Sequence, residues 1–427
     1  MITSPTWRGK RYAVLGLARS GAATVRALVA SGAEVTAWDS SEAARTAVSG
    51  AAIANPEEID LAGFDGLVVS PGVPINRHPV AAKARAAGVP VIGDIELFAQ
   101  ARSDLPAHKL VGITGTNGKS TTTALIHHIL ENAGIPARLG GNIGTPILGE
   151  EPLAEGGVYV LELSSYQIDL TNSLDCDVAI LLNITPDHLD RYDGFEAYAA
   201  SKARLFAMQS AEHAAIIGIG DAASARIAQS LSARGEHLTK IAPGICMDQS
   251  RWPSLQGPHN AQNALAAIDA CKALGIGDAV IDRGLASFKG LPHRMERVAS
   301  RNGVAFVNDS KATNPDSTAP ALAAFDRIHW ILGGQAKTDD LDACARSFGH
   351  VVRAYTIGES GPRFAAILRA LMPVEESGTL EAALTSAAAK AVAGETVLLS
   401  PASASFDQFR DFEDRGDRFR TLVGALA

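Results

Sequence analysis

The segment GITGTNGKSTTT at residues 112–123 limits the fold more than any other stretch of the chain. An apolar run at 110–113 leads into its glycine-containing turn, and an amphipathic helix begins at about residue 119. A strand, a glycine-containing turn and a helix N-terminus in this order bind phosphate, because backbone N–H groups of the turn point at the anion. The segment therefore predicts a parallel α/β sheet that binds a nucleotide at the carboxyl end of one strand.

The loop departs at one position from the usual pattern G-x-x-x-x-G-K-[ST]. The pattern requires glycine five residues before Gly118, and Ile113 stands there instead. Gly115 can supply the tight turn, Lys119 can reach the outer phosphates, and the Ser120 hydroxyl suits Mg²⁺. An ordinary strand–turn–helix connection usually lacks the Gly-Lys-Ser triplet, so we predict nucleotide binding.

Short β-rich runs alternate with alanine-rich helical runs along the whole chain. This alternation is typical of α/β domains with mostly parallel sheets. Polar or proline-containing stretches at 101–108 and 290–292 separate three such groups, and 207–256 shows no clear pattern. The expected domains are a Rossmann-like domain at 1–105, an ATP-binding P-loop-type α/β domain at 106–291 and a Rossmann-like domain at 292–427.

Composition argues against several classes of protein. A net charge of −8 gives no electrostatic support for a nucleic-acid partner. No apolar run is long enough to span a bilayer, and residues 1–16 lack the apolar core of a signal peptide. Cys176, Cys246, Cys271 and Cys344 form no C-x-x-C pair, which disfavours a zinc site and a disulfide framework. We expect a cytoplasmic protein with no membrane insertion.

Two polar residues follow apolar runs downstream of the loop. Glu162 ends one run, where an unpaired buried carboxylate would be costly; Mg²⁺ on a nucleotide or a structural ion pair would satisfy it. His188 lies between Asp187 and Asp190 after the next run, at the kind of strand end where open α/β sheets bind ligands. Spacing gives Lys202 no special status, since a surface helix lysine would look the same.

The N-terminal group carries an imperfect dinucleotide fingerprint. Gly16 to Gly21 resembles G-x-G-x-x-G, with Ala18 in place of the middle glycine. Asp39 follows at a distance suited to a ribose or base contact. The missing glycine disfavours dehydrogenase-type pyrophosphate binding and leaves open another phosphate-bearing nucleotide.

The C-terminal group has three strand ends that are rich in polar residues. Lys311 and Thr313 follow one strand, Lys337 follows another, and Ser405 follows the last. Turn and capping chemistry accounts for serine and asparagine at such places, but less well for two lysines. We therefore predict that these residues bind an anionic substrate through a carboxylate.

Eight blocks of the chain, taken together, resemble the ATP-dependent Mur ligases of peptidoglycan precursor synthesis. The blocks are TGTNGKST at 114–121, GGNIGTP at 140–146, LELSSYQ at 161–167, NITPDHLDRY at 183–192, HNAQNALAA at 259–267, HR at 293–294, NDSKATN at 308–314 and LLSPASASFDQF at 398–409. They span nearly the whole chain in the order of the family. The last two look specific to members that add D-glutamate. The family's own phosphate loop is T-G-T-N-G-K-[ST], so Ile113 fits it.

The resemblance implies an amide-bond-forming reaction. The γ-phosphoryl group of ATP would pass to the L-alanine carboxylate of UDP-N-acetylmuramoyl-L-alanine. The amine of D-glutamate would attack the acyl phosphate, and phosphate would leave. Such chemistry depends mostly on positioning and charge neutralisation. We expect closure of the domains on ATP and a monomeric enzyme.

The resemblance also implies roles by position. Lys119 would neutralise the β,γ-phosphates, and Ser120 with Glu162 would hold one Mg²⁺. His188 and a carbamylated Lys202 would hold a second Mg²⁺. The implied ATP contacts are Gly115, Thr116, Asn117, Gly118, Lys119, Ser120, Thr121, Asn260, Asn263, Arg294 and Asp309. The implied contacts to the UDP-substrate are Gly16, Leu17, Ala18, Arg19, Ser20, Asp39, Ser70, Pro71, Gly72 and Asn142, the last also near the reacting groups. The implied contacts to D-glutamate are Lys311, Thr313, Lys337, Ser405, Phe406 and Phe412.

Other interpretations fit parts of the sequence. Ser40-Ser41 stands where some relatives carry an arginine near the uracil, which leaves the uracil contacts open. Another amino-acid-adding Mur ligase, an L-glutamate-adding enzyme or a folylpolyglutamate synthase would share the fold. A P-loop switch protein would not need the two further anion-binding groups, and a nicotinamide dehydrogenase would need a better fingerprint.

Overall fold

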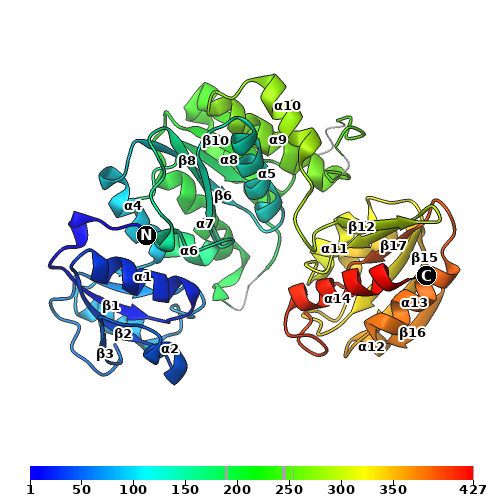
Figure 1. Cartoon of the computed structure of the whole chain (residues 1–427), viewed down its shortest axis with the longest axis horizontal. Coiled ribbons are helices and arrows are strands. Elements are labelled where there is room, and N and C mark those ends of the chain that lie inside the picture. The colour runs from blue at the N-terminus through cyan, green and yellow to red at the C-terminus, as the bar shows by residue number, and fades with distance from the viewer. Residues whose placement is uncertain (188–190, 243–246, 253, 427) are drawn as a thin grey trace. The chain divides into compact units, whose positions relative to one another are not determined.

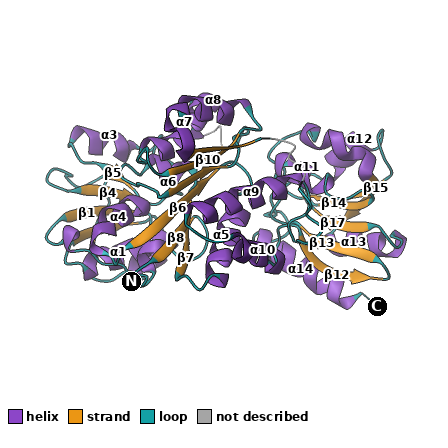
Figure 2. Ribbon diagram, turned by 90° about the horizontal axis from the view of Figure 1, so that it is seen from above, coloured by secondary structure: helices purple, strands orange, loops and turns teal. Residues whose placement is uncertain are grey.

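The computed structural model describes residues 1–187, 191–242, 247–252 and 254–426. Three β-sheets, each with helices on both sides, make up the chain (Figures 1 and 2). They fall into two compact units, Met1–Pro243 with Gln262–Leu285 and Gly244–Ala261 with Ala286–Ala427. The first unit holds two sheets and the second unit holds one. The alternation of strands and helices predicted from the sequence is confirmed, while the boundaries near 105 and 291 stay a prediction.

The N-terminal sheet is parallel throughout and has the order β3-β2-β1-β4-β5. Its strands are β1 Arg11–Leu15, β2 Glu34–Trp38, β3 Ala52–Ile53, β4 Gly66–Val69 and β5 Val91–Ile92. Its helices are α1 Arg19–Ala30, α2 Glu42–Thr46, α3 Pro79–Ala86 and α4 Asp94–Ala101. The two-residue strands β3 and β5 are too short to give a periodic signal in the sequence.

The central sheet is also parallel and has the order β11-β10-β9-β6-β8-β7. Its strands are β6 His108–Thr114, β7 Ala137–Gly141, β8 Gly157–Glu162, β9 Val178–Leu181, β10 Ala214–Gly218 and β11 Leu238–Ile241. The accompanying helices are α5 Lys119–Asn132, α6 Ser165–Asp169, α7 Gly194–Ala207, α8 Ala222–Ser230, α9 Pro258–Ala273 and α10 Asp278–Ser287. The unpatterned stretch 207–256 thus holds the edge strand β11, its neighbour β10 and the helix α8.

The C-terminal sheet has the order β12-β13-β17-β14-β15-β16 and is parallel except for β12. Its strands are β12 Glu296–Arg301, β13 Val304–Asn308, β14 Ile328–Gly333, β15 Val351–Ile357, β16 Val374–Gly378 and β17 Thr396–Leu399. Its helices are α11 Pro315–Leu322, α12 Gly361–Leu368, α13 Leu380–Lys390 and α14 Phe412–Ala425. The antiparallel strand β12 is an edge strand without fully buried residues, which explains why its residues form no apolar run.

The described residues also include short 3₁₀ helices and lack a membrane-spanning helix. The 3₁₀ segments are Pro5–Trp7, Arg102–Asp104, Ile147–Gly149, Ser232–His237 and Asp342–His350. None of the helices in the described part of the chain is long and apolar enough to cross a bilayer.

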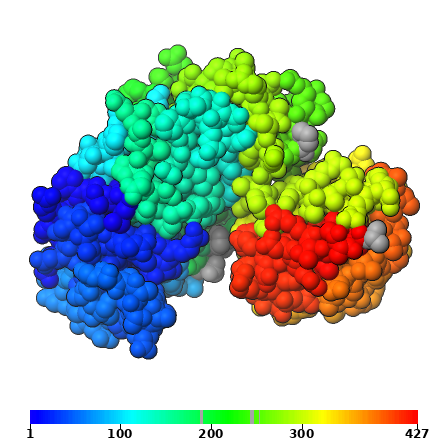
Figure 3. Space-filling model, viewed as in Figure 1, coloured from blue at the N-terminus to red at the C-terminus, as the bar shows by residue number. Residues whose placement is uncertain are grey.

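The N-terminal and central sheets pack together within the first unit. In Figure 3 the surface of the first residues, in blue, lies directly against the cyan and green surface of the central sheet. The backbone N–H of Ile2 donates to the carbonyl of Leu148 (3.1 Å), and the Arg19 guanidinium donates to the carbonyl of Gly144 (2.7 Å). The two sheets therefore form one framework, which holds the loops at their edges in a defined relation.

Strand β6 is the centre of this framework, since it pairs with β8 on one side and β9 on the other. Leu110, Val111 and Ile113 are fully buried, as expected for a parallel strand that is covered on both faces. Gly112 is packed just as closely, because a Cβ atom at this position would lie 2.7 Å from the Cys176 sulfur. The strand below the phosphate loop thus has no room for an extra methyl group.

We predict that Gly112→Ala destabilises the central sheet by about 1–3 kcal/mol, the usual effect of overpacking a core. A lower melting temperature in calorimetry would show it. The double variant Gly112→Ala/Cys176→Ala should recover most of the loss, because it removes the sulfur that clashes.

Gly277→Ala is the matched control, since a Cβ atom there meets no heavy atom within 4 Å. Equal melting temperatures for Gly112→Ala and the wild type would contradict the packing argument.

Candidate active site

The loop after β6 has the backbone geometry of an anion cradle. Gly115 and Gly118 have φ angles of 149° and 88°, which L-residues with a side chain rarely adopt. Gly118 caps the N-terminus of α5, and a Cβ atom there would lie 2.3 Å from the Asn263 side-chain oxygen. The Lys119 ammonium folds back over the loop and donates to the carbonyls of Gly115 (2.8 Å) and Thr116 (2.9 Å). The loop thus combines a helix N-terminus with a cation, as phosphate binding requires.

Asn183, at the end of β9, braces this loop. Its backbone carbonyl accepts from the N–H of Thr116, and its side-chain oxygen accepts from the N–H of Asn117, both at 2.9 Å. Its side-chain N–H₂ donates back to the carbonyl of Asn117 (3.1 Å). The sequence analysis did not select Asn183, although an asparagine directly after an apolar strand could have indicated it.

Glu162 ends β8 beside the loop and is 2% exposed. One carboxylate oxygen accepts from the Ser120 hydroxyl (2.5 Å), and the other accepts from the side-chain N–H₂ of Asn142 (2.9 Å). Gly141 allows this approach, because a Cβ atom at its φ of 89° would lie 2.1 Å from the Glu162 carbonyl oxygen. The structure therefore brings together the predicted residues Ser120, Glu162 and Asn142.

The Ser120 hydroxyl and the Glu162 carboxylate are oxygen donors of the kind that bind Mg²⁺. Among the described residues, no group of three or more His, Cys, Asp or Glu side chains could hold a metal ion. Mg²⁺ commonly takes one or two carboxylates and completes its shell with phosphate oxygens and water. Ser120 and Glu162 therefore fit a nucleotide-bound Mg²⁺.

Lys202, on α7, lies next to Lys119 and is only 1% exposed. Its ammonium group donates to the carbonyl of Gly115 (3.0 Å) and sits over the ring of Tyr198, 4.7 Å from the centroid. Burial, and then the charge of Lys119, hold the pKa of Lys202 well below its usual value. The amine therefore has a low cost of losing its proton, which spacing in the sequence could not reveal. His188, predicted as its partner, lies outside the described residues.

The predicted UDP-substrate residues gather at the carboxyl ends of β1, β2 and β4. Asp39 accepts from the backbone N–H groups of Leu17 (2.7 Å) and Ser41 (2.8 Å). Burial alone would raise its pKa, but these hydrogen bonds and the charge of Arg45 lower the pKa of Asp39 overall. The Ser70 hydroxyl donates to the carbonyl of Gly16 (2.8 Å).

The glycine fingerprint of this sheet has a packing role. A Cβ atom at Gly21 would lie 1.8 Å from the Gly16 carbonyl oxygen, so Gly21 lets α1 begin close to β1. Leu17, Ala18, Arg19 and Ser20 lie between these glycines, with Arg19 already bonded to Gly144. Pro71 and Gly72 follow Ser70 in the loop after β4.

In the second unit, the predicted D-glutamate residues lie on loops after the neighbouring strands β13, β17 and β14. The Lys311 ammonium group lies over the Phe412 ring, 3.9 Å from the centroid. A two-way backbone hydrogen bond between Gln335 and Ala404 (2.9 Å each way) joins the loop that carries Lys337 to the loop that carries Ser405. Thr313 follows Lys311, and Phe406 follows Ser405. Ser405 is 2% exposed, whereas Phe406 is 68% exposed.

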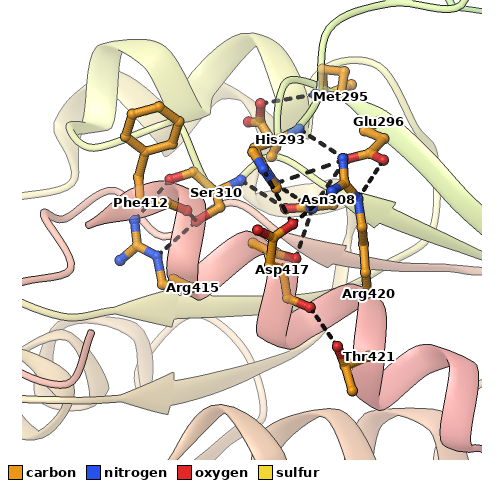
Figure 4. A network of polar contacts seen from close by, with 12 residues as sticks. His293, Met295, Glu296, Asn308, Ser310, Phe412, Arg415, Asp417, Arg420 and Thr421 are labelled. Atoms are coloured by element: carbon orange, nitrogen blue, oxygen red, sulfur yellow. Dashed lines mark hydrogen bonds and ion pairs between the residues drawn. The ribbon is translucent and has the colours of Figure 1, made fainter. Parts of the chain in front are cut away.

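Arg415, on α14, joins these loops and was missed by the sequence analysis. It is 1% exposed and donates to the hydroxyl and the carbonyl of Ser310 (2.9 and 2.8 Å). It also donates to the carbonyl of Ser403 (3.0 Å). Burial lowers the pKa of Arg415 to about 10. Figure 4 shows Arg415 and Phe412 beside Ser310, and Ser310 directly precedes Lys311 in the chain.

The HR pair, His293 and Arg294, lies in a turn with left-handed backbone conformations. His293 and Met295 have φ angles of 60° and 50°, which place Arg294 in a sharp, strained turn. This turn packs on Gly416, where a Cβ atom would lie 2.1 Å from His293 Nδ1. Figure 4 shows the polar network that surrounds it, in which Arg420 donates to Glu296 (2.7 Å).

Asp309, the other predicted ATP contact of this unit, is bonded within the same network. It accepts from the Ser400 hydroxyl (2.8 Å) and from the backbone N–H of Met295 (3.1 Å). Asn260 belongs to this second unit, and Asn263 belongs to the first. Both asparagines are buried on α9.

Comparison with known proteins places the chain in a family. Three family models match it: the Mur ligase MurD-like N-terminal domain at 10–93, the Mur ligase middle domain at 113–246 and the Mur ligase glutamate ligase domain at 293–403. A relative from Novosphingobium aromaticivorans is 65% identical over 100% of this chain and 97% of its own length. The chain belongs to the Mur ligase family. The three-domain α/β architecture expected from the sequence is thereby confirmed.

Two relatives of this Mur ligase share one name. The Novosphingobium protein and a Sphingopyxis alaskensis protein, 62% identical over 100% of both chains, are each named UDP-N-acetylmuramoylalanine–D-glutamate ligase. Among solved structures, UDP-N-acetylmuramate-alanine ligase MurC from Thermotoga maritima superposes with a TM-score of 0.59 at 15% identity, covering 97% of this chain and 99% of its own. MurF from Acinetobacter baumannii gives 0.59 at 15% identity, covering 99% and 92%. These two structures support the fold alone.

We predict that Asp309 makes the stability of the second unit depend on pH. Burial raises the pKa of Asp309 from its usual value of 3.8 to about 7. Between these values the folded protein holds a proton that the unfolded chain has released, so stability falls as the pH rises. The melting temperature of the wild type, minus that of Asp309→Asn, should therefore fall from about pH 4 to about pH 7 and then level off.

Asp326→Asn, at an exposed position, is the matched control and should show no such trend. A difference between wild type and Asp309→Asn that rises over this range would contradict the prediction.

Proposed function

We propose that this Mur ligase is an ATP-dependent, ADP-forming enzyme that joins D-glutamate to UDP-N-acetylmuramoyl-L-alanine in peptidoglycan precursor synthesis. The observation that carries the proposal is the shared name of relatives that are up to 65% identical over the whole chain. The phosphate loop and the carboxylate-binding loops described above supply the chemistry that such a reaction needs. The pathway makes the cytoplasm the expected compartment, and we propose a monomer.

In the first step, the γ-phosphoryl group of ATP passes to an oxygen of the L-alanine carboxylate, and ADP leaves. The loop 115–121 and Lys119 hold the phosphates and neutralise the charge that develops on them. Asn263, packed against Gly118, lies where it can help to seat the nucleotide. We assign Asn260, Arg294 and Asp309 to the remaining contacts with ATP.

Bound Mg²⁺ would supply positive charge that offsets the negative charge of the phosphates. Ser120 and Glu162 would hold one ion, because their oxygens already meet beside the loop. We propose a second ion held by His188 and by a carbamate on Lys202. A carbamate forms when a neutral amine attacks CO₂ and loses a proton, and the buried, low-pKa amine of Lys202 suits that reaction.

In the second step, the amine of D-glutamate attacks the acyl phosphate carbon, a tetrahedral intermediate collapses, phosphate leaves and the amine proton is released. Lys311 and Lys337 carry charges that match the two carboxylates of D-glutamate. Thr313, Ser405, the loop residue Phe406 and Phe412 at the start of α14 complete this proposed pocket. The UDP part would bind at Gly16–Ser20, Asp39 and the loop 70–72, with Asn142 near the reacting carboxylate.

The direct test is phosphate release from ATP in the presence of UDP-N-acetylmuramoyl-L-alanine. We expect release only when D-glutamate is added, and none with L-glutamate. Lys119→Ala should lower kcat by about 100-fold or more, because a charge that stabilises the transition state is lost. Lys109→Ala is the matched control, because Lys109 is exposed near the amino end of β6, away from the loop; this variant should be as active as the wild type.

Release with another amino acid and none with D-glutamate would replace the proposed substrate. Full activity of Lys119→Ala would remove the loop from the mechanism.

The carbamate on Lys202 predicts a spectroscopic signal. With ¹³C-labelled bicarbonate, a carbamate resonance should appear in the wild type and be missing from Lys202→Ala. Lys272→Ala, which removes a half-exposed lysine paired with Asp278, should keep the resonance. A wild-type spectrum without a protein carbamate, recorded on active enzyme, would exclude this assignment.

A further inference from the structure

Arg191 links two parts of the first unit that the proposed mechanism treats separately. It stands at the end of the block NITPDHLDRY, in the loop between β9 and α7. Its guanidinium donates to the carbonyls of Pro71 (3.4 Å) and Val73 (3.2 Å), on the loop after β4. The side chain of Asn76 donates back to the Arg191 carbonyl. One arginine therefore fixes the backbone on both sides of Gly72.

An aromatic ring also holds the guanidinium of Arg191. The guanidinium lies over Tyr166 of α6, 4.2 Å from the ring centroid. Tyr166 is stacked on Tyr192 at 6.0 Å between centroids and 15° between planes. Tyr192 in turn contacts Tyr198 of α7 at 5.4 Å. We call these three rings the tyrosine stack. Figure 1 shows α6 and α7, which carry two of them, beside each other.

The far end of the tyrosine stack reaches the phosphate loop. The Tyr198 hydroxyl is hydrogen-bonded to the Thr116 hydroxyl (3.1 Å), and the Tyr198 ring lies under the Lys202 ammonium group. The middle ring is tied down as well, because the Tyr192 hydroxyl donates to the Asp169 carboxylate (2.8 Å). An unbroken series of contacts thus runs from the carbonyls beside Gly72 to Thr116 and Lys202.

The surroundings of Arg191 leave room for it to move if these contacts are lost. A cavity of about 840 Å³ lies beside it and is lined by the loop 71–77, Tyr166, Tyr192 and Arg204. Steric packing alone therefore does not fix the position of the guanidinium. Its position depends on the stacking with Tyr166 and on the two carbonyl acceptors, which suits a planar guanidinium better than an ammonium group.

We propose that Arg191 is a positioning residue that holds the loop 70–73 in the conformation that binds the UDP-substrate, and that the tyrosine stack keeps this loop aligned with the phosphate loop. The proposal rests on the function proposed above, in which Ser70, Pro71 and Gly72 contact that substrate. Arg191 would touch neither ATP nor the reacting atoms, so it would act through the backbone of the loop.

The test is steady-state kinetics of Arg191→Ala with UDP-N-acetylmuramoyl-L-alanine, ATP and D-glutamate varied in turn. We expect KM for the UDP-substrate to rise about tenfold or more, while kcat and the KM for ATP and D-glutamate change less than about threefold. Arg191→Lys should fall in between, because one ammonium group can reach a carbonyl but cannot stack in the same way. Arg77→Ala removes an exposed arginine that lines the same cavity and should behave as the wild type.

A double-mutant cycle tests the role of the tyrosine stack. Tyr166→Leu should raise the same KM, and Arg191→Ala/Tyr166→Leu should be no more than about twofold worse than Arg191→Ala alone, because both changes release the same loop. Independent, multiplying effects would show that the stack does not act through Arg191 and would overturn that part of the proposal.

Several results would overturn the proposal as a whole. An unchanged KM for the UDP-substrate in Arg191→Ala would do so, as would a loss confined to kcat or an equal loss in Arg77→Ala. If Arg191→Ala does not fold, as judged by its melting temperature, the KM for the UDP-substrate is compared in Arg191→Lys and Arg191→Gln instead. Failure of the proposed function is distinguishable, because the wild type itself would then show no turnover with D-glutamate.

Discussion

The parallel pairing of β9, β6 and β8 is the constraint on which the rest of this protein depends. In parallel strands all carboxyl ends meet at one edge, so the loops that follow three strands are brought together without any further device. Here that edge collects the phosphate loop, Glu162 and Asn183, which come from positions up to 68 residues apart in the chain. The buried aliphatic residues of these strands stabilise this arrangement, and the polar groups at the strand ends are available for chemistry.

The same edge brings two lysines to a single backbone atom. Lys119 and Lys202 both donate to the carbonyl of Gly115, at 2.8 and 3.0 Å. Burial first, and then the nearby charge of Lys119, lower the pKa of Lys202. Lys119 is half-buried at the start of α5, whereas Lys202 is fully buried, which suits the two different roles that we propose for them. Environment, and not residue type, thus separates the two roles.

Much of this could be read from the sequence, and the remainder shows where local reasoning ends. The strand–loop–helix at 108–123 and the polar strand ends of the third sheet follow from local patterns. Lys202, Asn183 and Arg415 do not, because their importance comes from burial and from partners more than 60 residues away. The tyrosine stack escaped notice for the same reason, since Tyr166 and Tyr192 become neighbours only after folding. The antiparallel strand β12 lacked a signal because it is an edge strand that buries little.

The placement of the loops that we propose bind D-glutamate has an evolutionary consequence. Lys311, Lys337 and Ser405 all stand after strands of the third sheet, outside its apolar layers, and none of them belongs to the phosphate loop or to its sheet. Insertions and substitutions in such loops cost a fold little stability. Under the proposed function, one amino-acid substrate could therefore be exchanged for another by changes in three short loops, while the phosphate loop and its sheet stay the same.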